Sequence, residues 1–186
     1  MACDFIPVGQ AADKCEENYA GTGTTAYLFK SDAVDMTALK IDAATNTYTG
    51  FKLKEGQKIT PIALKNQANK VTSTLLKQGR GFKNVATIVV DKDLDVAAVA
   101  ARVASNTRFG MLLPKPGIAQ GAYILWNPNV DTTLEISDDT GDAFDSDNQA
   151  SWTVSAAPMA YPRMAISDTE FKTLTINTTG GSSSIG

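Results

Sequence analysis

Few side chains of this sequence could support catalysis or metal binding. Its 186 residues include 17 basic and 20 acidic side chains and two cysteines, but no histidine. Histidine is the one side chain whose unperturbed pKa lies near neutral pH, and it is the commonest metal ligand. Its absence excludes Ser-His-Asp and Cys-His catalysis within the chain. Cys3 and Cys15 cannot complete a four-ligand structural zinc site; they can pair within or between chains, and we expect reduced thiols.

Acidic residues gather in one segment, which is the best candidate for binding a cation. Between Asp131 and Asp147 there are seven acids and no base. An EF-hand that begins at Asp145 would need glycine at its sixth position and glutamate at its twelfth, but the chain has Ala150 and Ala156 there. The sequence therefore predicts no EF-hand. A looser calcium site over residues 138–147 remains an alternative to a solvated loop.

Two further patterns resemble those of enzymes, but neither has the sequence context that its chemistry requires. The segment from Gly21 to Ala26 has the letters of a dinucleotide fingerprint, but polar residues precede it and strand formers follow it. That mechanism needs a strand before the glycines and a helix after them. A glycosidase needs two placed carboxylates, and nothing in the sequence selects two acids from twenty. We expect no enzyme activity and no cofactor.

Basic residues are also segregated along the chain. Residues 52–92 contain nine bases against two acids. Such asymmetry indicates contact with nucleic acid, contact between the basic face of one copy and the acidic face of another, or an ordinary solvated surface. Phe82 is the only aromatic residue after Phe51 in this stretch, so stacking platforms for a single strand are scarce.

Short β-strands dominate the predicted secondary structure, separated by clusters of Gly, Asn, Asp and Pro. Pro61 cannot donate to a ladder, so its segment belongs at an edge or a bulge. Trp126 and Trp152 lie in strand-like contexts and are expected in the core rather than stacked on a ligand. The strand-like segments are residues 24–29, 48–53, 57–65, 71–77, 84–92, 109–113, 122–126, 132–136, 151–156 and 171–177.

The clearest local signal is a hairpin formed by residues 71–77 and 84–92. The connecting residues 78–83 contain Gly79 and Gly81, which can adopt positive φ. Lys77, Arg80 and Lys83 would lie at the tip, so the hairpin would form a positively charged projection.

One segment reads as a helix, over residues 93–105. It is rich in alanine, begins with acidic residues and carries Arg102 toward its end, which suits the helix dipole. Leu94, Ala98 and Ala101 recur at helical spacing, so one face should pack on a sheet. Residues 31–40 are compatible with a helical turn capped by Ser31 and are left undecided.

These elements make a single, mainly β domain over residues 21–177, with an N-terminal arm at 1–20 and a flexible tail at 178–186. Asp4 and the absence of a long apolar run argue against a signal peptide or a membrane span, so we expect synthesis in a cytosol.

The order of elements resembles that of the major tail tube proteins of long-tailed phages, most closely those of phages and prophages of Bacteroidetes-type bacteria. The resemblance covers about residues 20–164. It is carried by the Lys- and Thr-rich strand from Asn69 to Leu75, the glycine-bearing loop, the alanine-rich helix, and the strands that contain Met111 and Leu112, Trp126, and Trp152-Thr153-Val154-Ser155-Ala156. Residues 31–48 and those from 167 onward have no counterpart in this pattern.

The resemblance implies a β-sandwich or partial barrel with one flanking helix and a long projecting hairpin. Family members form hexameric rings whose subunits contribute strands to a continuous inner barrel, and the rings stack into a tube, as in contractile injection and type VI secretion systems. The implied partners are further copies of the chain, the tape-measure protein and DNA in the lumen, and other tail proteins at the tube ends. The implied location is the virion tail, with synthesis in the host cytoplasm.

Charge segregation then suggests an assembly interface between successive rings. We expect the basic hairpin on one side and the acidic segment on the other, with the helix residues Leu94, Ala98, Ala101 and Arg102 packing near a neighbour. The expected interface residues are Lys77, Arg80, Phe82, Lys83, Asp138, Asp139, Asp142, Asp145 and Asp147.

Two alternatives remain open at this point. One is a capsid-decorating or connector protein, which would form lone trimers or single rings. The other is a monomeric carbohydrate- or calcium-binding β-sandwich, in which Trp126, Trp152 and the acidic segment would form the site.

Overall fold

The computed structural model describes residues 22–65, 69–77, 79–90, 102, 104, 106–116, 121–139, 149–178 and 181–184. The described residues are mainly β, with two principal sheets and a short helix at residues 168–172, which confirms the predicted mainly β fold. The larger sheet has the order β2-β3-β11-β8-β7-β1-β4, and the smaller has the order β5-β6-β10-β9. A two-stranded ribbon, β12-β13, completes the described strands.

The strands of the larger sheet are mostly short. They are β1 (Thr25–Lys30), β2 (Lys40–Asp42), β3 (Thr47–Thr49), β4 (Thr60–Ala63), β7 (Phe109–Pro114), β8 (Ala122–Leu125) and β11 (Ala165–Ile166). The ribbon consists of β12 (Thr175–Thr178) and β13 (Gly181–Ser184).

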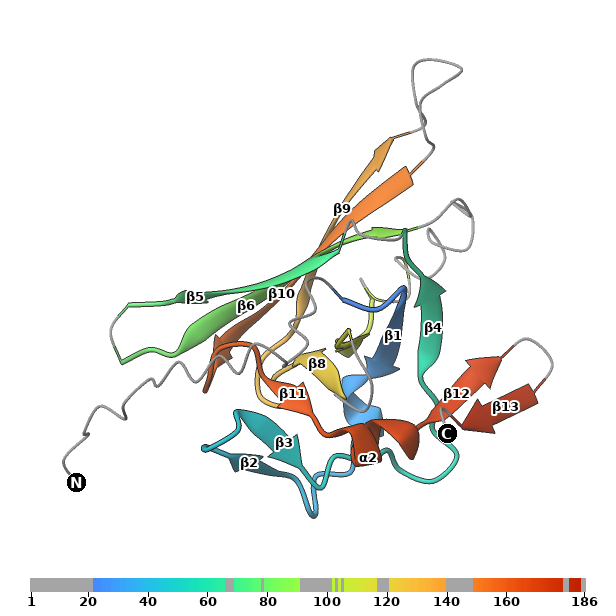
Figure 1. The fold of residues 1–186 in the computed structure, drawn as a ribbon, viewed down its shortest axis with the longest axis horizontal. Helices are drawn as coiled ribbons and strands as arrows, with labels where there is room; N and C mark the ends of the chain where they lie inside the picture. The colour runs from blue at the N-terminus through green and yellow to red at the C-terminus, as the bar shows by residue number, and fades with distance from the viewer. Residues whose placement is uncertain are drawn as a thin grey trace, which may run out of the picture.

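The smaller sheet is built from longer strands and is fully antiparallel. Its strands are β5 (Lys70–Leu75), β6 (Phe82–Val90), β9 (Thr133–Asp139) and β10 (Gln149–Met159). Figure 1 shows it as an elongated layer that reaches beyond the larger sheet at both ends. The hairpin of β5 and β6 forms one of these projections, and β9 with β10 forms the other.

One hydrophobic core lies between the two sheets. Alternation along β6 buries Ala86, Ile88 and Val90, and β10 adds Trp152 and Val154. The larger sheet contributes its own buried residues to the same cluster, among them Phe29, Met111, Leu112, Ile124 and Leu125. Because β7 and β8 are buried almost throughout, they read in the sequence as unbroken apolar runs.

An aromatic cluster around Trp126 fixes the centre of the larger sheet. Phe29, Phe51 and Tyr48 surround its indole with ring centroids 5.8 to 6.0 Å away. The indole N–H donates to Ser31 Oγ at 2.7 Å. Burial raises the pKa of the Tyr48 phenol to about 12. A side chain at Gly110 would overlap the Phe29 ring, so only glycine fits beneath this cluster.

The strongest local predictions are confirmed. Leu75 pairs with Phe82 at the end of the hairpin, and Gly79 and Gly81 have φ of 79° and 86°. Pro61 lies on β4, at the edge of the larger sheet. Both tryptophans are buried, with 1% of their surface exposed.

Other segments differ from prediction at their boundaries. The acidic segment does not begin as a loop, because Asp138 and Asp139 continue β9. Strand β10 runs past Pro158 with a register shift between Ala156 and Met159. Residues 181–184, which the sequence assigned to a flexible tail, pair with β12.

The segment 171–177 was predicted as one strand, and this is wrong for its first part. Helix α2 (Asp168–Lys172) occupies it, begun by a reciprocal capping box between Ser167 and Glu170. The second oxygen of the Glu170 carboxylate also accepts from the backbone N–H groups of Gly50 and Phe51. This side chain therefore anchors α2 to the turn after β3.

Little of the predicted helix 93–105 lies within the described residues. Arg102 and Ala104 are described, and both are helical. Leu94, Ala98 and Ala101 lie outside the described residues. The turn Ser31–Ala33 is a short 3-10 helix, and β1 follows the fingerprint-like segment as a strand, not as the helix that nucleotide binding requires.

The two tryptophans differ in one respect that stability measurements can test. Trp126 donates to Ser31, whereas the Trp152 indole N–H is buried without a hydrogen-bond partner among the described residues. Trp126→Phe should therefore lower the free energy of unfolding by roughly 1 kcal/mol more than Trp152→Phe, because it also leaves the Ser31 hydroxyl without its hydrogen-bond partner. Urea denaturation of both variants measures the difference, and an equal or larger cost for Trp152→Phe would contradict it.

Candidate assembly interface

The smaller sheet has one face in the core and one face toward solvent. Strand β6 shows this most clearly, since Asn84, Ala86 and Ile88 are buried while the alternate residues are partly or fully exposed. The register extends the outer face across all four strands. That face is dominated by small hydroxyl side chains, at Thr72, Thr74, Thr87, Thr133, Ser137, Ser151, Thr153 and Ser155.

Strand β5 forms one edge of this sheet and pairs only with β6 among the described strands. The Leu76 N–H donates to Gly81 O at 2.9 Å, which shows that Leu76 and Gly81 form a hydrogen-bonded pair of the β5–β6 ladder. Hydrogen-bonded pairs alternate along an antiparallel ladder. The backbone groups of Thr72 and Thr74 therefore point toward β6, and those of Val71, Ser73 and Leu75 point outward.

Strand β9 forms the opposite edge. The register shows which of its backbone groups point outward, because hydrogen-bonded pairs can be followed from β6 through β10 to β9. The even residues of β6 face β10, so the odd residues of β10 face β9. Ser155 and Thr153 then bond to Thr133 and Glu135. The backbone groups of Leu134 and Ile136 consequently point outward, away from the sheet.

The two edges match each other in pleat. The outward-pointing residues of β5 and those of β9 all lie on the core side of the sheet. Directly opposed residues in an antiparallel pair place their side chains on the same face. Because the sheet has an even number of antiparallel strands, β5 of one copy can pair with β9 of another while both faces continue unbroken.

Apolar side chains and charge also differ in a complementary way at these edges. Leu75 on β5 is 58% exposed and Ile136 on β9 is 38% exposed, and both are large hydrophobic residues. Residues 70–90 carry four bases and no acid, whereas residues 131–139 carry four acids and no base. Unpaired edges of this kind are templates for strand pairing.

The β5–β6 hairpin is held to the body by a buried amide. Asn84 is 1% exposed, and its Oδ1 accepts from Ser73 Oγ at 2.6 Å and from the Arg163 backbone N–H at 3.2 Å. Its Nδ2 donates to Tyr161 O at 3.2 Å. One side chain therefore joins both strands of the hairpin to the segment after β10, which fixes the direction in which the hairpin projects.

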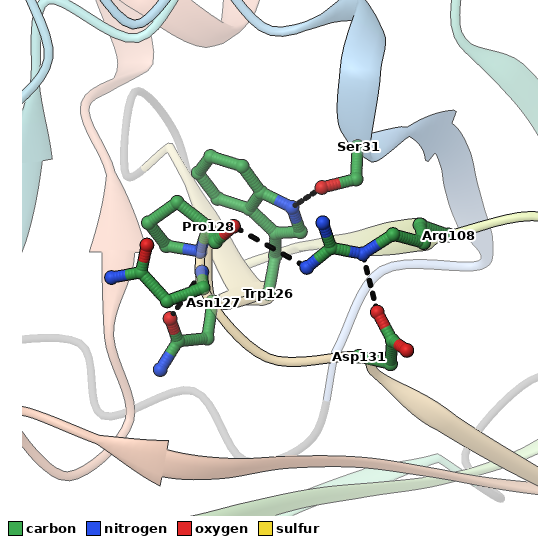
Figure 2. A network of polar contacts seen from close by, with 7 residues as sticks. Ser31, Arg108, Trp126, Asn127, Pro128 and Asp131 are labelled. Atoms are coloured by element: carbon green, nitrogen blue, oxygen red, sulfur yellow. Dashed lines mark hydrogen bonds and ion pairs between the residues drawn. The ribbon is translucent and has the colours of Figure 1, made fainter.

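A second polar network fixes the beginning of β9, where the chain crosses from the larger sheet to the smaller one. Figure 2 shows the Arg108 guanidinium between Asp131 and the carbonyl of Pro128, beside the Trp126 indole. The Asn127 side chain accepts from the backbone N–H of Asn129 at 2.9 Å. These bonds close the turn between β8 and β9 and set where the β9 edge starts.

The expected interface residues divide into described and undescribed positions. Lys77, Arg80 and Lys83 are exposed at the hairpin end, and Phe82 is half-buried there. Asp138 and Asp139 lie at the end of β9. Arg102 is exposed. Asp142, Asp145 and Asp147 lie outside the described residues, as does most of the proposed calcium segment.

The sequence reasoning missed the residues that shape the edges. Asn84, Leu75 and Ile136 were not singled out. The position of Asn84 between apolar strand residues was one available signal, because a polar residue on the buried face of a strand needs partners. The Ser-x-x-Glu spacing of Ser167 and Glu170 was a second, missed, signal for α2.

Other kinds of site find little support within the described residues. No group of three or more acidic or cysteine side chains there could hold a metal ion. Trp126 and Trp152 are buried, so neither can stack on a carbohydrate. No helix in the described ranges is long and apolar enough to cross a membrane.

Comparison with known proteins returned no match to a protein-family model, to a curated protein or to a solved structure.

The role of Asn84 can be tested by removing its side chain. Asn84→Ala should lower the free energy of unfolding by about 2 kcal/mol, because the Ser73 hydroxyl loses its acceptor and the Tyr161 carbonyl loses its donor, whereas the Arg163 N–H keeps its bond to Ser73 Oγ at 2.8 Å. Amide hydrogen exchange in β5 should accelerate more than exchange in β7. Asn129→Ala, at an exposed asparagine, is the matched control and should change stability by less than about 0.5 kcal/mol. Equal effects of the two variants would refute the anchoring role.

Proposed function

We propose that this protein is a structural subunit that assembles into closed rings, which stack into the tube of a phage tail. The observation that carries the proposal is the smaller sheet, whose two edges have no partner among the described strands and match in pleat, strand direction, apolar surface and charge. The resemblance in element order to major tail tube proteins points to the same kind of assembly.

Strand direction supports closure by rotation. Cyclic symmetry keeps the direction of each strand along the ring axis. In a sheet of four antiparallel strands, β5 and β9 run in opposite directions. Each β5 would therefore meet the β9 of the next copy in antiparallel orientation, which leaves no open edge once the ring closes.

The outer face of the smaller sheet would line the channel, because its other face packs on the core. Six copies, the number that the resemblance implies, would supply about 24 strands. With strands about 4.8 Å apart and tilted by about 40°, such a barrel has a backbone diameter of about 50 Å. A barrel of this size holds an open channel wide enough for duplex DNA.

The hydroxyl-rich lining suits a conduit rather than a binding site. Tight binding of nucleic acid needs Lys and Arg at the phosphates or aromatic side chains under the bases. Among the described outer-face residues, Lys70 and Lys83 lie on the β5 side and Glu135 lies on the β9 side. Closure would bring these opposite charges together and leave the small hydroxyls facing the cargo.

The proposal can be tested by blocking the β5 edge without disturbing its own ladder. Proline removes a backbone donor, and Val71 points its N–H outward, so Val71→Pro should abolish rings and tubes while the monomer stays folded. Electron microscopy and sedimentation velocity measure assembly, and circular dichroism measures folding.

Ala63→Pro is the matched control. Ala63 is exposed on β4, the edge of the other sheet, where Pro61 already occupies an equivalent outward position two residues earlier. We expect Ala63→Pro to assemble like the parent chain. Tubes formed by Val71→Pro would contradict edge pairing, and a parent chain that remains monomeric would contradict the assembly function itself.

A further inference from the structure

A hollow of about 630 Å³ lies at the beginning of β9. Its walls include Thr107 and Arg108, which lead into β7, and Asp131, Thr132 and Leu134, which lead into and begin β9. Thr132 is 7% exposed, and its hydroxyl has no hydrogen-bond partner among the described residues. Arg108 is the one basic residue among those that line the hollow, and it is paired with Asp131.

The tip of the β5–β6 hairpin overhangs the rest of its own sheet. Thr133, the first residue of β9, is level with Ser155 on β10, Val85 on β6 and Thr72 on β5. The end of β5 from Ser73 to Leu75 and the following turn therefore continue past the level at which β9 starts. Figure 1 shows this end of the hairpin clear of the other described elements.

We propose that the hairpin tip of one copy docks in the hollow at the beginning of β9 in the next copy of the ring. This inference rests on the proposed function, because it takes the antiparallel pairing of β5 with β9 as its starting point. Antiparallel pairing places the end of one strand beside the beginning of the other. The overhanging tip then lies against the segment that precedes β9, which lines the hollow.

Charge and exposed apolar surface both fit this occupant. The tip presents Lys77 and Arg80, both exposed, and the segment beside the hollow presents Asp131, whose carboxylate is 69% exposed although it pairs with Arg108. Leu75 at the tip is 58% exposed, and Val130 just before β9 is 37% exposed, so docking would cover two apolar side chains that the single chain leaves in water.

The contact would lie within a ring. Charge segregation in the sequence alone suggested a contact between successive rings for the same hairpin. The strand directions, the overhang and the position of the hollow favour the lateral neighbour. The two arrangements differ in which residues the tip touches, so cross-linking separates them.

Site-specific cross-linking tests the contact. Cys3 and Cys15 are first replaced by serine, and chains carrying Arg80→Cys are mixed with chains carrying Thr107→Cys. Assembled particles are isolated by sedimentation and treated with a short bifunctional thiol reagent. We expect a dimer band between the two kinds of chain. Thr60→Cys, exposed on β4, replaces Thr107→Cys in the control and should give none.

Each outcome has a distinct meaning. Assembled particles without the Arg80-to-Thr107 cross-link overturn the docking proposal and leave the ring function standing. If the serine-substituted parent chain does not assemble although the unmodified chain does, the cysteine pairs are tested in the unmodified chain with the same expectations. A failure of the unmodified chain to assemble overturns both proposals.

A non-covalent pair of variants gives a second readout. Leu75→Ser should raise the concentration needed for half-maximal assembly by roughly tenfold, since it removes an apolar contact buried only on docking. Met36→Ser, at a residue that is 50% exposed in the connection between Ala33 and β2, should leave it unchanged. Equal effects of the two variants would overturn the docking of the tip.

Discussion

The structure depends on how the backbone hydrogen bonds of four long antiparallel strands are satisfied. The strands β5, β6, β10 and β9 are joined by continuous antiparallel pairing apart from the register shift after Ala156, and among the described strands the two outer ones keep one unpaired side each. Exposed edges are a liability unless something pairs with them or blocks them. Here the free groups on both edges belong to residues on the core side, so the edges are suited to each other and the sheet can repeat from copy to copy.

The remaining parts of the fold hold this sheet in place. The larger sheet supplies the opposite wall of the core and centres it on Trp126. Asn84 ties the hairpin to the segment after β10, and the Arg108 network fixes the start of β9. Both networks sit where a small change in strand direction would misalign an edge. Their polar atoms are largely satisfied, which favours one geometry over many.

Much of the fold followed from sequence, and the failures have physical causes. The hairpin was predictable because Gly79 and Gly81 lie between two strand-like segments. The buried strand before Trp126 was predictable because its run of apolar residues is unbroken. Helix α2 was missed because Phe171 and Leu174 look like strand residues when the capping box is overlooked. The interface residues were only partly predictable. Charge segregation marks the hairpin in the sequence, but which backbone groups point outward depends on register, and register is set by pairing between distant strands.

Residue-resolved hydrogen exchange tests the central claim, that β5 of one copy pairs with β9 of the next, most directly. In the monomer the amides of Val71, Ser73, Leu75, Leu134 and Ile136 should exchange freely, whereas those of Thr72 and Thr74 are protected by β6. On assembly the account predicts that the outward amides gain strong protection while those of Thr72 and Thr74 stay protected as before. Outward amides that still exchange at the monomer rate in assembled particles would contradict the account.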